Sequence, residues 1–215
     1  NSPRRKNRKK MGRFETGELP DLAGYEVLVG VCGGIAAYKV CEVVSRLVQR
    51  GAGVTVAMTR AARKFVGTTT FEALTARQVI TSLWSAGGVA DSPHIRLTAA
   101  ADLTLIAPAT ADMIGKMASG IADDVVSTLV TCATFPVVLA PAMNDRMWAN
   151  PIVQGNVRKL IDHGYTLVGP KEGWLACRNV GAGRMAEPEE ILEAVVPLLT
   201  GRAPHSKTVE GQSAS

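Results

Sequence analysis

The sequence predicts one α/β domain built on a doubly wound parallel sheet of about six strands, a three-layer α/β/α arrangement of Rossmann-like type. Short runs of apolar, β-forming residues alternate along the chain with longer segments of helical period, and glycine or proline separates them. The chain has 215 residues, of which 47% are hydrophobic and 20% charged, as expected for one soluble domain with a sizeable core. No apolar run approaches the roughly 18 residues that span a membrane.

We expect the folded domain over residues 21–200, between a basic disordered leader at 1–20 and a disordered tail at 201–215. Residues 1–13 include seven Lys or Arg and no acid, which more than accounts for the formal net charge of +5. Such runs repel themselves and stay solvated; contact with nucleic acid or an anionic surface is the alternative. The leader lacks the apolar core of a secretory signal. We therefore expect neither a nucleic acid nor a membrane partner for the folded domain.

The first strand is expected at 25–31 and the first helix at 35–50, joined by a glycine-rich turn. Such a turn leaves backbone N–H groups free at the positive end of the helix dipole, where a phosphate can bind. Gly33, Gly34 and Ile35 are the candidate cradle. The turn matches neither Gly-x-Gly-x-x-Gly nor the P-loop pattern, which argues against a dinucleotide or a nucleoside triphosphate. A tight turn without a ligand is the alternative.

A second strand at 54–58 leads into Thr59, which can cap a helix that includes residues 61–65. Residues 78–80 form a weak third strand. His94 then follows a proline and precedes a helical segment, so it is expected in the first turn of a helix, directed toward the edge of the sheet. On its own, a single histidine is more often structural.

A fourth strand at 102–107 ends in the small-residue turn 108–112, where Thr110 is a natural N-cap. The small side chains of this turn would let a ligand approach the backbone closely. Asp123 and Asp124 precede the next helix. Neighbouring residues on a helix point about 100° apart and rarely share a proton. A helix N-terminal charge preference or a subunit contact therefore fits this pair better than acid–base work.

The last third of the chain contains strands at 137–140 and 165–168 and helices at 151–163 and 188–199, each helix begun by a proline. His163 precedes a glycine at the end of its helix and suits a C-terminal cap. Doubly wound sheets bind ligands at the carboxyl ends of their strands. The segments that follow the strands are therefore expected to converge on one site.

Two segments are expected to carry the chemistry. Residues 141–148 follow a buried strand and present Asn144, an amide with two donors and an acceptor, at the edge of the sheet. Residues 173–185 hold three glycines around Cys177 without a helical or strand period, so they are expected to form a mobile loop. A thiol on a flexible loop above a fixed amide is typical of an active site.

The four cysteines lie far apart, without a Cys-x-x-Cys pair or a histidine at metal-ligand spacing, which argues against a metal site or a disulfide framework. Cys32, Cys41 and Cys132 lie in apolar settings and are expected to be small buried residues. Cys177 alone lies among loop residues, which fits one working thiol in a reducing cytoplasm.

The segment Pro-Ala-Met-Asn-x-x-Met-Trp at 141–148 is followed by Ala-Cys-x-x-x-Gly-x-Gly-Arg-Met at 176–185. The two together strongly resemble the motifs of phosphopantothenoylcysteine decarboxylases, which belong to the homo-oligomeric flavin-containing cysteine decarboxylases. The resemblance covers residues 25–199 and implies FMN-dependent conversion of 4'-phospho-N-pantothenoylcysteine to 4'-phosphopantetheine in coenzyme A biosynthesis, by a cytoplasmic trimer or tetramer of trimers. Arg178 and Asn179 depart from this pattern, which has Gly-Asp there.

The resemblance also implies a role for each site residue. His94 would be the base of the oxidative half-reaction, Asn144 would hold the substrate carboxylate, and Cys177 would donate a proton to the enethiolate. The residues expected to contact the flavin are Gly33, Gly34, Ile35, Thr59, Pro108, Ala109, Thr110, Ala111, Ala142 and Met143. Those expected to contact the substrate, besides Asn144, are Trp174, Ala176, Arg184 and Met185.

Three alternatives stay open beside this interpretation. A flavin decarboxylase acting on the C-terminal cysteine of a peptide would keep His94 and Asn144 but would need no Ala-Cys segment. A flavin prenyltransferase would have neither motif. A flavin-binding subunit that regulates a phosphatase would keep the fold and the flavin without the chemistry, so turnover would separate it from an enzyme.

Overall fold

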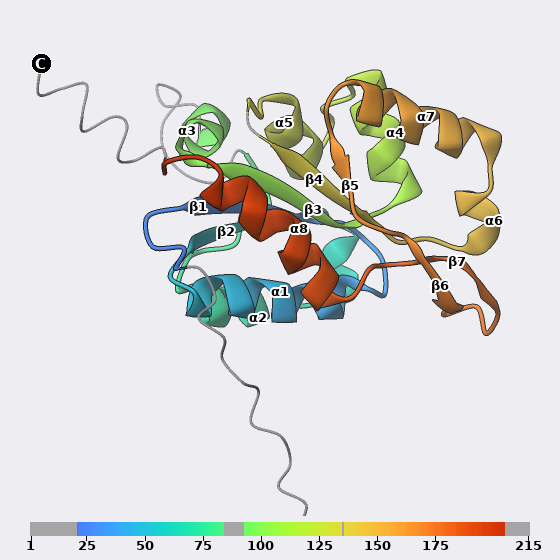
Figure 1. Ribbon diagram of the computed structural model, residues 1–215, viewed down its shortest axis with the longest axis horizontal. Helices are drawn as coiled ribbons and strands as arrows, with labels where there is room; N and C mark the ends of the chain where they lie inside the picture. Colours follow the sequence, from blue (N-terminus) through green and yellow to red (C-terminus); the bar gives the residue numbers. More distant parts are fainter. Residues whose placement is uncertain (1–20, 84–92, 135, 205–215) are drawn as a thin grey trace, which may run out of the picture.

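Five parallel strands in the order β2-β1-β3-β4-β5 form the central sheet of the structure, a computed structural model that describes residues 21–83, 93–134 and 136–204. Helices cover both faces of this sheet, as Figure 1 shows. The predicted doubly wound fold of three layers is thereby confirmed. The strands are β1 (Glu26–Val31), β2 (Gly53–Met58), β3 (Leu103–Ala109), β4 (Val137–Pro141) and β5 (Thr166–Leu167).

The strand order of the sheet reverses between β1 and β3, which is the topological switch point of the fold. From β1 the chain moves outward to β2, then crosses to the other side of β1 to form β3 and continues through β4 to β5. The carboxyl ends of β1 and β3 therefore border the crevice in which doubly wound sheets bind their ligands.

Two layers of helices enclose the sheet (Figure 1), and each builds its own apolar core. The layer on one face consists of α1 (Ala37–Gln49), α2 (Thr68–Thr75) and α8 (Pro188–Thr200). The layer on the other face consists of α3 (Pro93–Ala100), α4 (Ala111–Ser119), α5 (Val125–Thr131) and α7 (Pro151–Asp162). Two short helices, η1 (Ala62–Lys64) and α6 (Asp145–Trp148), follow β2 and β4.

The sheet is buried on both sides because successive side chains of each strand enter opposite layers. The valines of β1 belong to the core beneath α1 and α8, whereas Leu28 belongs to the opposite core. Gly30 leaves room for the second layer, since a Cβ at this position would lie 2.6 Å from Ile106 and 2.7 Å from Val126. This close approach seats α5 directly on the sheet.

Several helix ends follow the sequence signals. Thr110 caps α4 by accepting a hydrogen bond from the amide of Met113, at 3.3 Å. Asp124 caps α5 in a capping box, which confirms the helix-start interpretation for Asp124, whereas Asp123 pairs with Lys116. His163 stands at the C-cap of α7, where its ring Nδ1 lies 2.8 Å from a carbonyl oxygen of the preceding turn.

Two elements are smaller than the sequence suggested. The strand predicted at 78–80 is a single bridge between Ala57 and Ile80, so the sheet has five strands instead of about six. The segment is too short for a ladder, and Val79 alone among its residues is buried. The helix predicted at 61–65 is one 3-10 turn, η1, because the chain becomes extended again at Gly67 to start α2.

The prediction of a mobile loop at 173–185 is wrong, because this segment forms a β-hairpin. Strands β6 (Lys171–Trp174) and β7 (Val180–Arg184) pair antiparallel, with Cys177 in the connecting turn. The glycines of the segment conceal the side-chain alternation by which a strand is recognised. They also permit a close approach: at Gly183, where φ is +143°, a Cβ would lie 2.3 Å from the carbonyl oxygen of Met143.

Burial of the cysteines matches the expectation in part. Cys32 is buried and Cys177 is exposed, but Cys41 and Cys132 are half-buried. The reason is their place in the helices: Cys41 lies on the flank of α1 beside its buried stripe, and Cys132 is the C-cap of α5.

The predicted leader at 1–20 and residues 205–215 of the predicted tail lie outside the described residues. Over the ranges that the structure does describe, no helix combines the length and the apolar character needed to cross a bilayer.

Candidate active site

A cavity of about 1080 Å³ opens at the carboxyl ends of the strands. Its walls come from the glycine turn after β1, the residues after β2, the start of α4, the segment after β4 and the hairpin. Cavities of this size hold small molecules and cofactors. The predicted site residues that line it are Gly33, Gly34, Ile35, Thr59, Thr110, Ala111, Ala142, Met143, Asn144, Trp174, Ala176, Cys177, Arg184 and Met185.

The glycine turn leaves the start of α1 open to this cavity. α1 has no capping side chain, and within the described ranges the amides of Gly33 and Ile35 have no hydrogen-bond acceptor. A Cβ at Gly33 would lie 2.3 Å from the Cβ of Ala61, whereas one at Gly34 would meet nothing closer than 3.7 Å. Close packing therefore requires a glycine at position 33, whereas a side chain would fit at position 34. Free amides at the start of a helix suit a phosphate.

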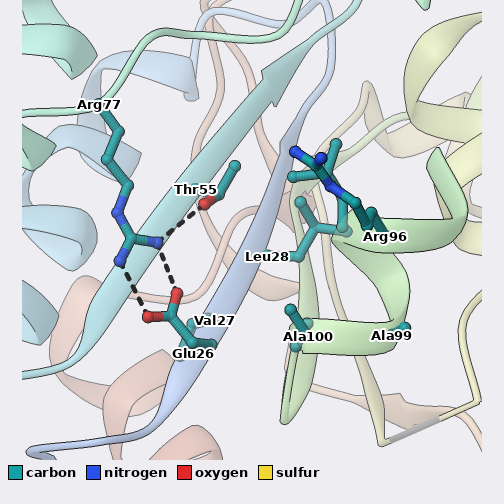
Figure 2. Close-up of a pocket in the computed structure, with 10 residues that line it drawn as sticks. Glu26, Val27, Leu28, Thr55, Arg77, Arg96, Ala99 and Ala100 are labelled. Carbon is teal, nitrogen blue, oxygen red and sulfur yellow. Dashed lines mark hydrogen bonds and ion pairs between the residues drawn. The ribbon is translucent and has the colours of Figure 1, made fainter. Parts of the chain in front are cut away.

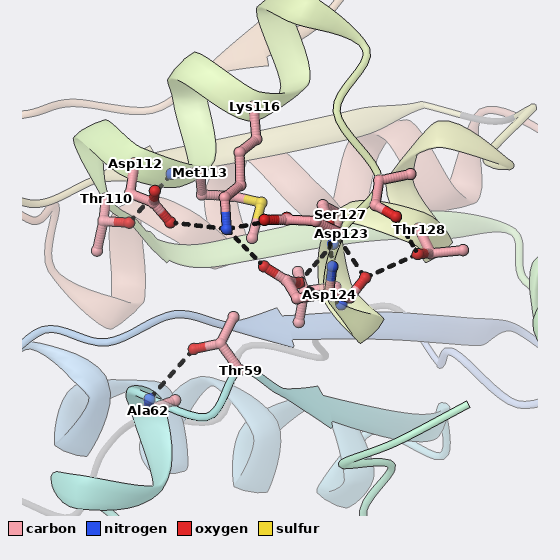
Figure 3. A network of polar contacts seen from close by, with 12 residues as sticks. Thr59, Ala62, Thr110, Asp112, Met113, Lys116, Asp123, Asp124, Ser127 and Thr128 are labelled. Atoms are coloured by element: carbon pink, nitrogen blue, oxygen red, sulfur yellow. Dashed lines mark hydrogen bonds and ion pairs between the residues drawn. The ribbon is translucent and has the colours of Figure 1, made fainter. Parts of the chain in front are cut away.

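Thr59 lies at the end of β2 and adds a hydroxyl to the same wall. Its side-chain oxygen accepts a hydrogen bond from the amide of Ala62 at 3.1 Å, as Figure 3 shows. The hydroxyl hydrogen is left to donate to a ligand. Arg60, the next residue, also lines the cavity. The hydroxyl and the guanidinium thus add a donor and a positive charge beside the open amides.

The small-residue turn after β3 is divided between the cavity and the core. Thr110 and Ala111 line the cavity. Pro108 and Ala109 do not line it, because β3 continues through them, and Ala109 is fully buried. The sequence analysis ended this strand at residue 107, two residues too early. The flavin contacts of Pro108 and Ala109 stay predictions.

Asn144 is fixed at the cavity wall from both ends of its amide. It is the N-cap of α6, and its Oδ1 accepts a hydrogen bond from the amide of Arg146 at 2.9 Å. Its Nδ2 donates to Sγ of Cys177 at 3.2 Å. Because Nδ2 carries two hydrogens, one remains for a ligand. The amide and the thiol that the sequence analysis singled out thus lie in contact.

Cys177 is the exposed thiol of the cavity, held in the hairpin turn by two backbone hydrogen bonds. The amide of Arg178 donates to the carbonyl of Leu175 at 2.9 Å, and the amide of Leu175 donates to the carbonyl of Asn179 at 2.8 Å. Arg178 has φ of +64°, a left-handed conformation that a side chain disfavours. Arg178 stands where the family pattern has glycine, so the tight turn forms here with some backbone strain at Arg178.

Cys32 is the other cysteine of the cavity wall, and it is buried. Burial raises the pKa of its thiol well above the ordinary value, and the nearby carboxylate of Asp124 adds to this rise. Cys32 therefore stays protonated at neutral pH, which leaves Cys177 as the thiol with access to a ligand.

The predicted substrate contacts at the hairpin include exposed and buried side chains. Trp174 is 65% exposed, whereas Met185 is 1% exposed and belongs to the core beneath α1. Arg184 forms an ion pair with Glu187. The same carboxylate accepts a hydrogen bond from Lys39 at 2.8 Å, and Lys39 also lines the cavity. The base of the hairpin is therefore tied to α1 and to the start of α8.

The sequence analysis missed Lys116, which stands at the centre of a polar network on the cavity wall (Figure 3). Its Nζ lies 3.3 Å from Asp112, 3.0 Å from Asp123 and 3.1 Å from Asp124. Burial by itself would lower the pKa of Lys116, but the hydrogen bonds to these carboxylates raise it. The spacing of Asp112 and Lys116 on one helix was a usable signal, whereas the other two partners come from beyond α4.

His94 lies in the first turn of α3, as predicted. Its side chain is outside the part of the chain that the structure describes, so its role stays a prediction. Among the described residues, no group of three or more His, Cys, Asp or Glu side chains could hold a metal ion.

A second cavity, of about 610 Å³, lies at the other end of the sheet near the start of β1. Figure 2 shows Arg77 on one side of it, paired with Glu26 and hydrogen-bonded to Thr55, and α3 with Arg96, Ala99 and Ala100 on the other. Its lining includes none of the predicted site residues. The carboxyl-edge cavity is therefore the candidate site.

The fold and the cavity together define a doubly wound α/β protein with a cavity at the switch point of its sheet, lined in part by a β-hairpin. The chain belongs to the Flavoprotein family, whose model matches residues 16–200.

Its relatives include bifunctional proteins of coenzyme A biosynthesis. The chain is 47% identical to the coenzyme A biosynthesis bifunctional protein CoaBC of Vibrio cholerae over 174 residues, which are 81% of this chain and 44% of that protein. It is also 47% identical to the CoaBC protein of Bacillus subtilis over 172 residues, 80% of this chain and 42% of that protein. The chain thus spans less than half the length of these curated relatives.

Solved structures with the same fold include flavin-dependent cysteine decarboxylases. The FMN-dependent cysteine decarboxylase SpaF superposes with a TM-score of 0.74 at 36% identity, over 84% of this chain and 98% of that one. A cysteine-to-serine variant of a PPC decarboxylase, in complex with pantothenoylaminoethenethiol, superposes with a TM-score of 0.75 at 29% identity, over 83% and 99% of the two chains.

Proposed function

We propose that this domain catalyses the FMN-dependent decarboxylation of 4'-phospho-N-pantothenoylcysteine to 4'-phosphopantetheine in coenzyme A biosynthesis. The observation that carries the proposal is the contact between the Asn144 amide and the Cys177 thiol, 3.2 Å apart in the lining of the cavity. It joins a group that can hold a carboxylate to a group that can deliver a proton. The CoaBC relatives and the PPC decarboxylase structure support this choice of reaction.

The residues of the cavity fit FMN. Open amides at Gly33 and Ile35, with the Thr59 hydroxyl beside them, would hold the phosphate. Thr110 and Ala111 on one wall and Ala142 and Met143 on another are the residues expected to contact the ribityl chain and the ring. When bound, FMN supplies the two-electron oxidation of the substrate thiol to a thioaldehyde and the later reduction of the enethiolate left when carbon dioxide departs.

Three side chains have separate roles in binding the substrate and in proton transfer. His94 is assigned as the base that takes a proton in the oxidative half-reaction. Asn144 holds the substrate carboxylate through its second Nδ2 hydrogen until the carbon–carbon bond breaks. Cys177 donates the proton that the enethiolate carbon takes up when it is reduced. The hairpin covers the site and limits the access of water to the intermediate.

The same site could serve a related decarboxylase with another cysteine-type substrate, such as a peptide that ends in cysteine. The 36% identity to SpaF is the observation that favours this second candidate. The higher identity to the CoaBC proteins favours the first. The prenyltransferase and the regulatory subunit are weaker candidates, since His94, Asn144 and Cys177 are all present.

We further propose that the chain works in the cytoplasm as a homo-oligomer, a trimer or a tetramer of trimers. Large apolar side chains gather around the mouth of the cavity: Ile35 is 58%, Tyr38 59% and Trp174 65% exposed. An exposed apolar patch of this kind supports a subunit contact beside the site.

The test is the visible absorbance of purified protein before and after anaerobic addition of phosphopantothenoylcysteine, with product masses read from the same sample. Yellow protein that releases carbon dioxide and 4'-phosphopantetheine is the expected result. Yellow protein that leaves this substrate intact but decarboxylates a peptide ending in cysteine would favour the second candidate. Protein that stays colourless after incubation with FMN would overturn the proposal.

A further inference from the structure

The hairpin docks onto three consecutive residues that follow β4. The amide of Met143 donates to the carbonyl of Gly183 at 2.9 Å. The Asn144 side chain donates to Cys177, and Nδ2 of Asn179 donates to Oδ2 of Asp145 at 3.3 Å. The first contact holds β7, and the other two hold the turn.

We propose that Asp145 is a positioning residue: by accepting the hydrogen bond from Asn179, it holds the hairpin turn so that the thiol of Cys177 stays beside the Asn144 amide. The inference rests on the proposed function where it concerns the use of that thiol. The docking itself stands on the described contacts alone.

The packing around Asp145 supports this assignment. A Cβ at Gly181 would lie 2.8 Å from the Cβ of Asp145 and 3.1 Å from its Oδ2. Strand β7 therefore passes directly over Asp145, and a glycine at this point is what permits it. The Asp145 carboxylate thus contacts both the strand and the turn, on either side of Val180.

The turn needs an external contact because its own structure is weak. Arg178 is held in a left-handed conformation that costs a side chain about 1 kcal/mol, and the turn has two internal backbone hydrogen bonds. Exposed turns with few contacts open easily. An anchor at Asn179 restrains the residue next to Arg178, two positions from the thiol.

A change of charge at position 179 tests the hydrogen bond between Asn179 and Asp145. An amide at 179 donates to the Asp145 carboxylate, but a carboxylate at 179 would face a second carboxylate at close range, and like charges repel. Asn179→Asp should therefore undock the turn. The double change Asp145→Asn with Asn179→Asp exchanges donor and acceptor and should dock it again.

The experiment compares wild type, Asn179→Asp and the double variant, each loaded with FMN, by hydrogen exchange measured on peptides. The amide of Met143 reports docking of β7, the strand that continues directly from the turn, because its hydrogen bond ends at Gly183. We expect exchange at this amide to rise about fivefold in Asn179→Asp, as a repulsion of about 1 kcal/mol at an exposed site allows. The double variant should return to within about twofold of wild type.

Internal controls separate docking from general loss of stability. Exchange in α7 and the flavin content should be the same in all three proteins. Equal exchange at Met143 in wild type and Asn179→Asp, or a double variant that exchanges as fast as Asn179→Asp, would overturn the proposal.

A second readout tests the use of the thiol. In a single anaerobic turnover, Asn179→Asp should release a larger share of oxidised enethiol than wild type, and the double variant should restore the normal product. If none of the proteins acts on phosphopantothenoylcysteine, the proposed function fails while the exchange result still decides the role of Asp145.

Discussion

Among single residues, Asn144 is the one whose hydrogen-bonding groups are most fully accounted for. Its Oδ1 is committed to α6 and one Nδ2 hydrogen to Cys177, so a single hydrogen is left to meet a substrate carboxylate. A substitution that keeps the cap and removes the donor therefore isolates this hydrogen.

Asn144→Asp is such a change, because aspartate caps a helix as well as asparagine does. We expect kcat/KM to fall about 100-fold, since a half-buried hydrogen bond to a charged substrate is replaced by repulsion. FMN content should not change. The matched control is Asn150→Asp, since Asn150 caps α7 in the same way, with Oδ1 2.9 Å from the amide of Ile152. An equal loss in both variants would contradict the role of Asn144.

Cys177→Ser addresses the last proton transfer. A hydroxyl at 177 is a much poorer acid than a thiol, so oxidation and loss of carbon dioxide should proceed while reduction of the enethiolate stalls. Mass spectrometry of a single anaerobic turnover should show the oxidised enethiol in place of 4'-phosphopantetheine. Cys132→Ser, on the half-buried cap of α5, should make normal product. Normal product at the wild-type rate from Cys177→Ser would exclude a donor role.

At the level of elements, the base of the hairpin is fastened by carboxylates of the α8 capping box. Glu187 binds Lys39 and Arg184, and Glu190 binds Lys171. The hydrogen bond from Lys39 lowers the pKa of Glu187, and that from Lys171 lowers the pKa of Glu190. A lowered pKa in the folded state means stability that is present above the ordinary value, about 4.3 for glutamate, and lost as the pH falls through the lowered value.

Glu187→Gln should therefore lower the melting temperature at pH 7 and flatten its decline as the pH falls below about 4.3, the ordinary pKa of glutamate. Thermal unfolding followed by circular dichroism across this range measures both effects. Glu193→Gln is the control on the same helix, since Glu193 is exposed and has no ion-pair partner among the described residues. Parallel profiles of melting temperature against pH for wild type and Glu187→Gln would show that this carboxylate contributes nothing to the pH dependence of stability.

For the whole molecule, the exposed apolar rim of the cavity makes a prediction about assembly. Tyr38→Arg introduces a charge at a position 59% exposed in the single chain, and burying that charge against a neighbour would be costly. Light scattering after gel filtration should show a smaller particle than the wild type. Ile161→Arg, a similar change on α7 away from the cavity, should leave the mass unchanged. Identical masses for wild type and Tyr38→Arg would place the subunit contact elsewhere.

The layered fold was predictable because it depends on local signals. The apolar runs of β1, β2, β3 and β4 and the stripe of α1 can be read along the chain, as can the prolines that begin α7 and α8. The cap at Thr110 was predictable for the same reason. The resemblance of the two motifs to a known family then predicted that the cavity residues belong to one site. That prediction did not require the strand order.

What escaped prediction depends on contacts between distant segments. The hairpin has glycines where a strand normally shows alternation, so its pairing is visible in space but not along the sequence. The three carboxylates around Lys116 come from two neighbouring segments, and the contact of Asn144 with Cys177 joins residues 33 positions apart. The end of β3 at Ala109 was missed because Pro108 and Ala109 resemble a turn in composition.

The hairpin follows the last strand of the sheet and closes on itself before α8 begins, since Lys171 at its beginning is paired with Arg184 at its end. A segment whose two ends lie together can be exchanged as a unit, provided that its replacement keeps the contacts to Met143, Asn144 and Asp145. The glycine turn and the strand ends would then be inherited unchanged, while new substrates are accommodated by replacing fourteen residues, 171–184. Grafting this segment from a relative that accepts peptides is a direct route to a domain with altered preference, and it offers an account of how such preferences diverge.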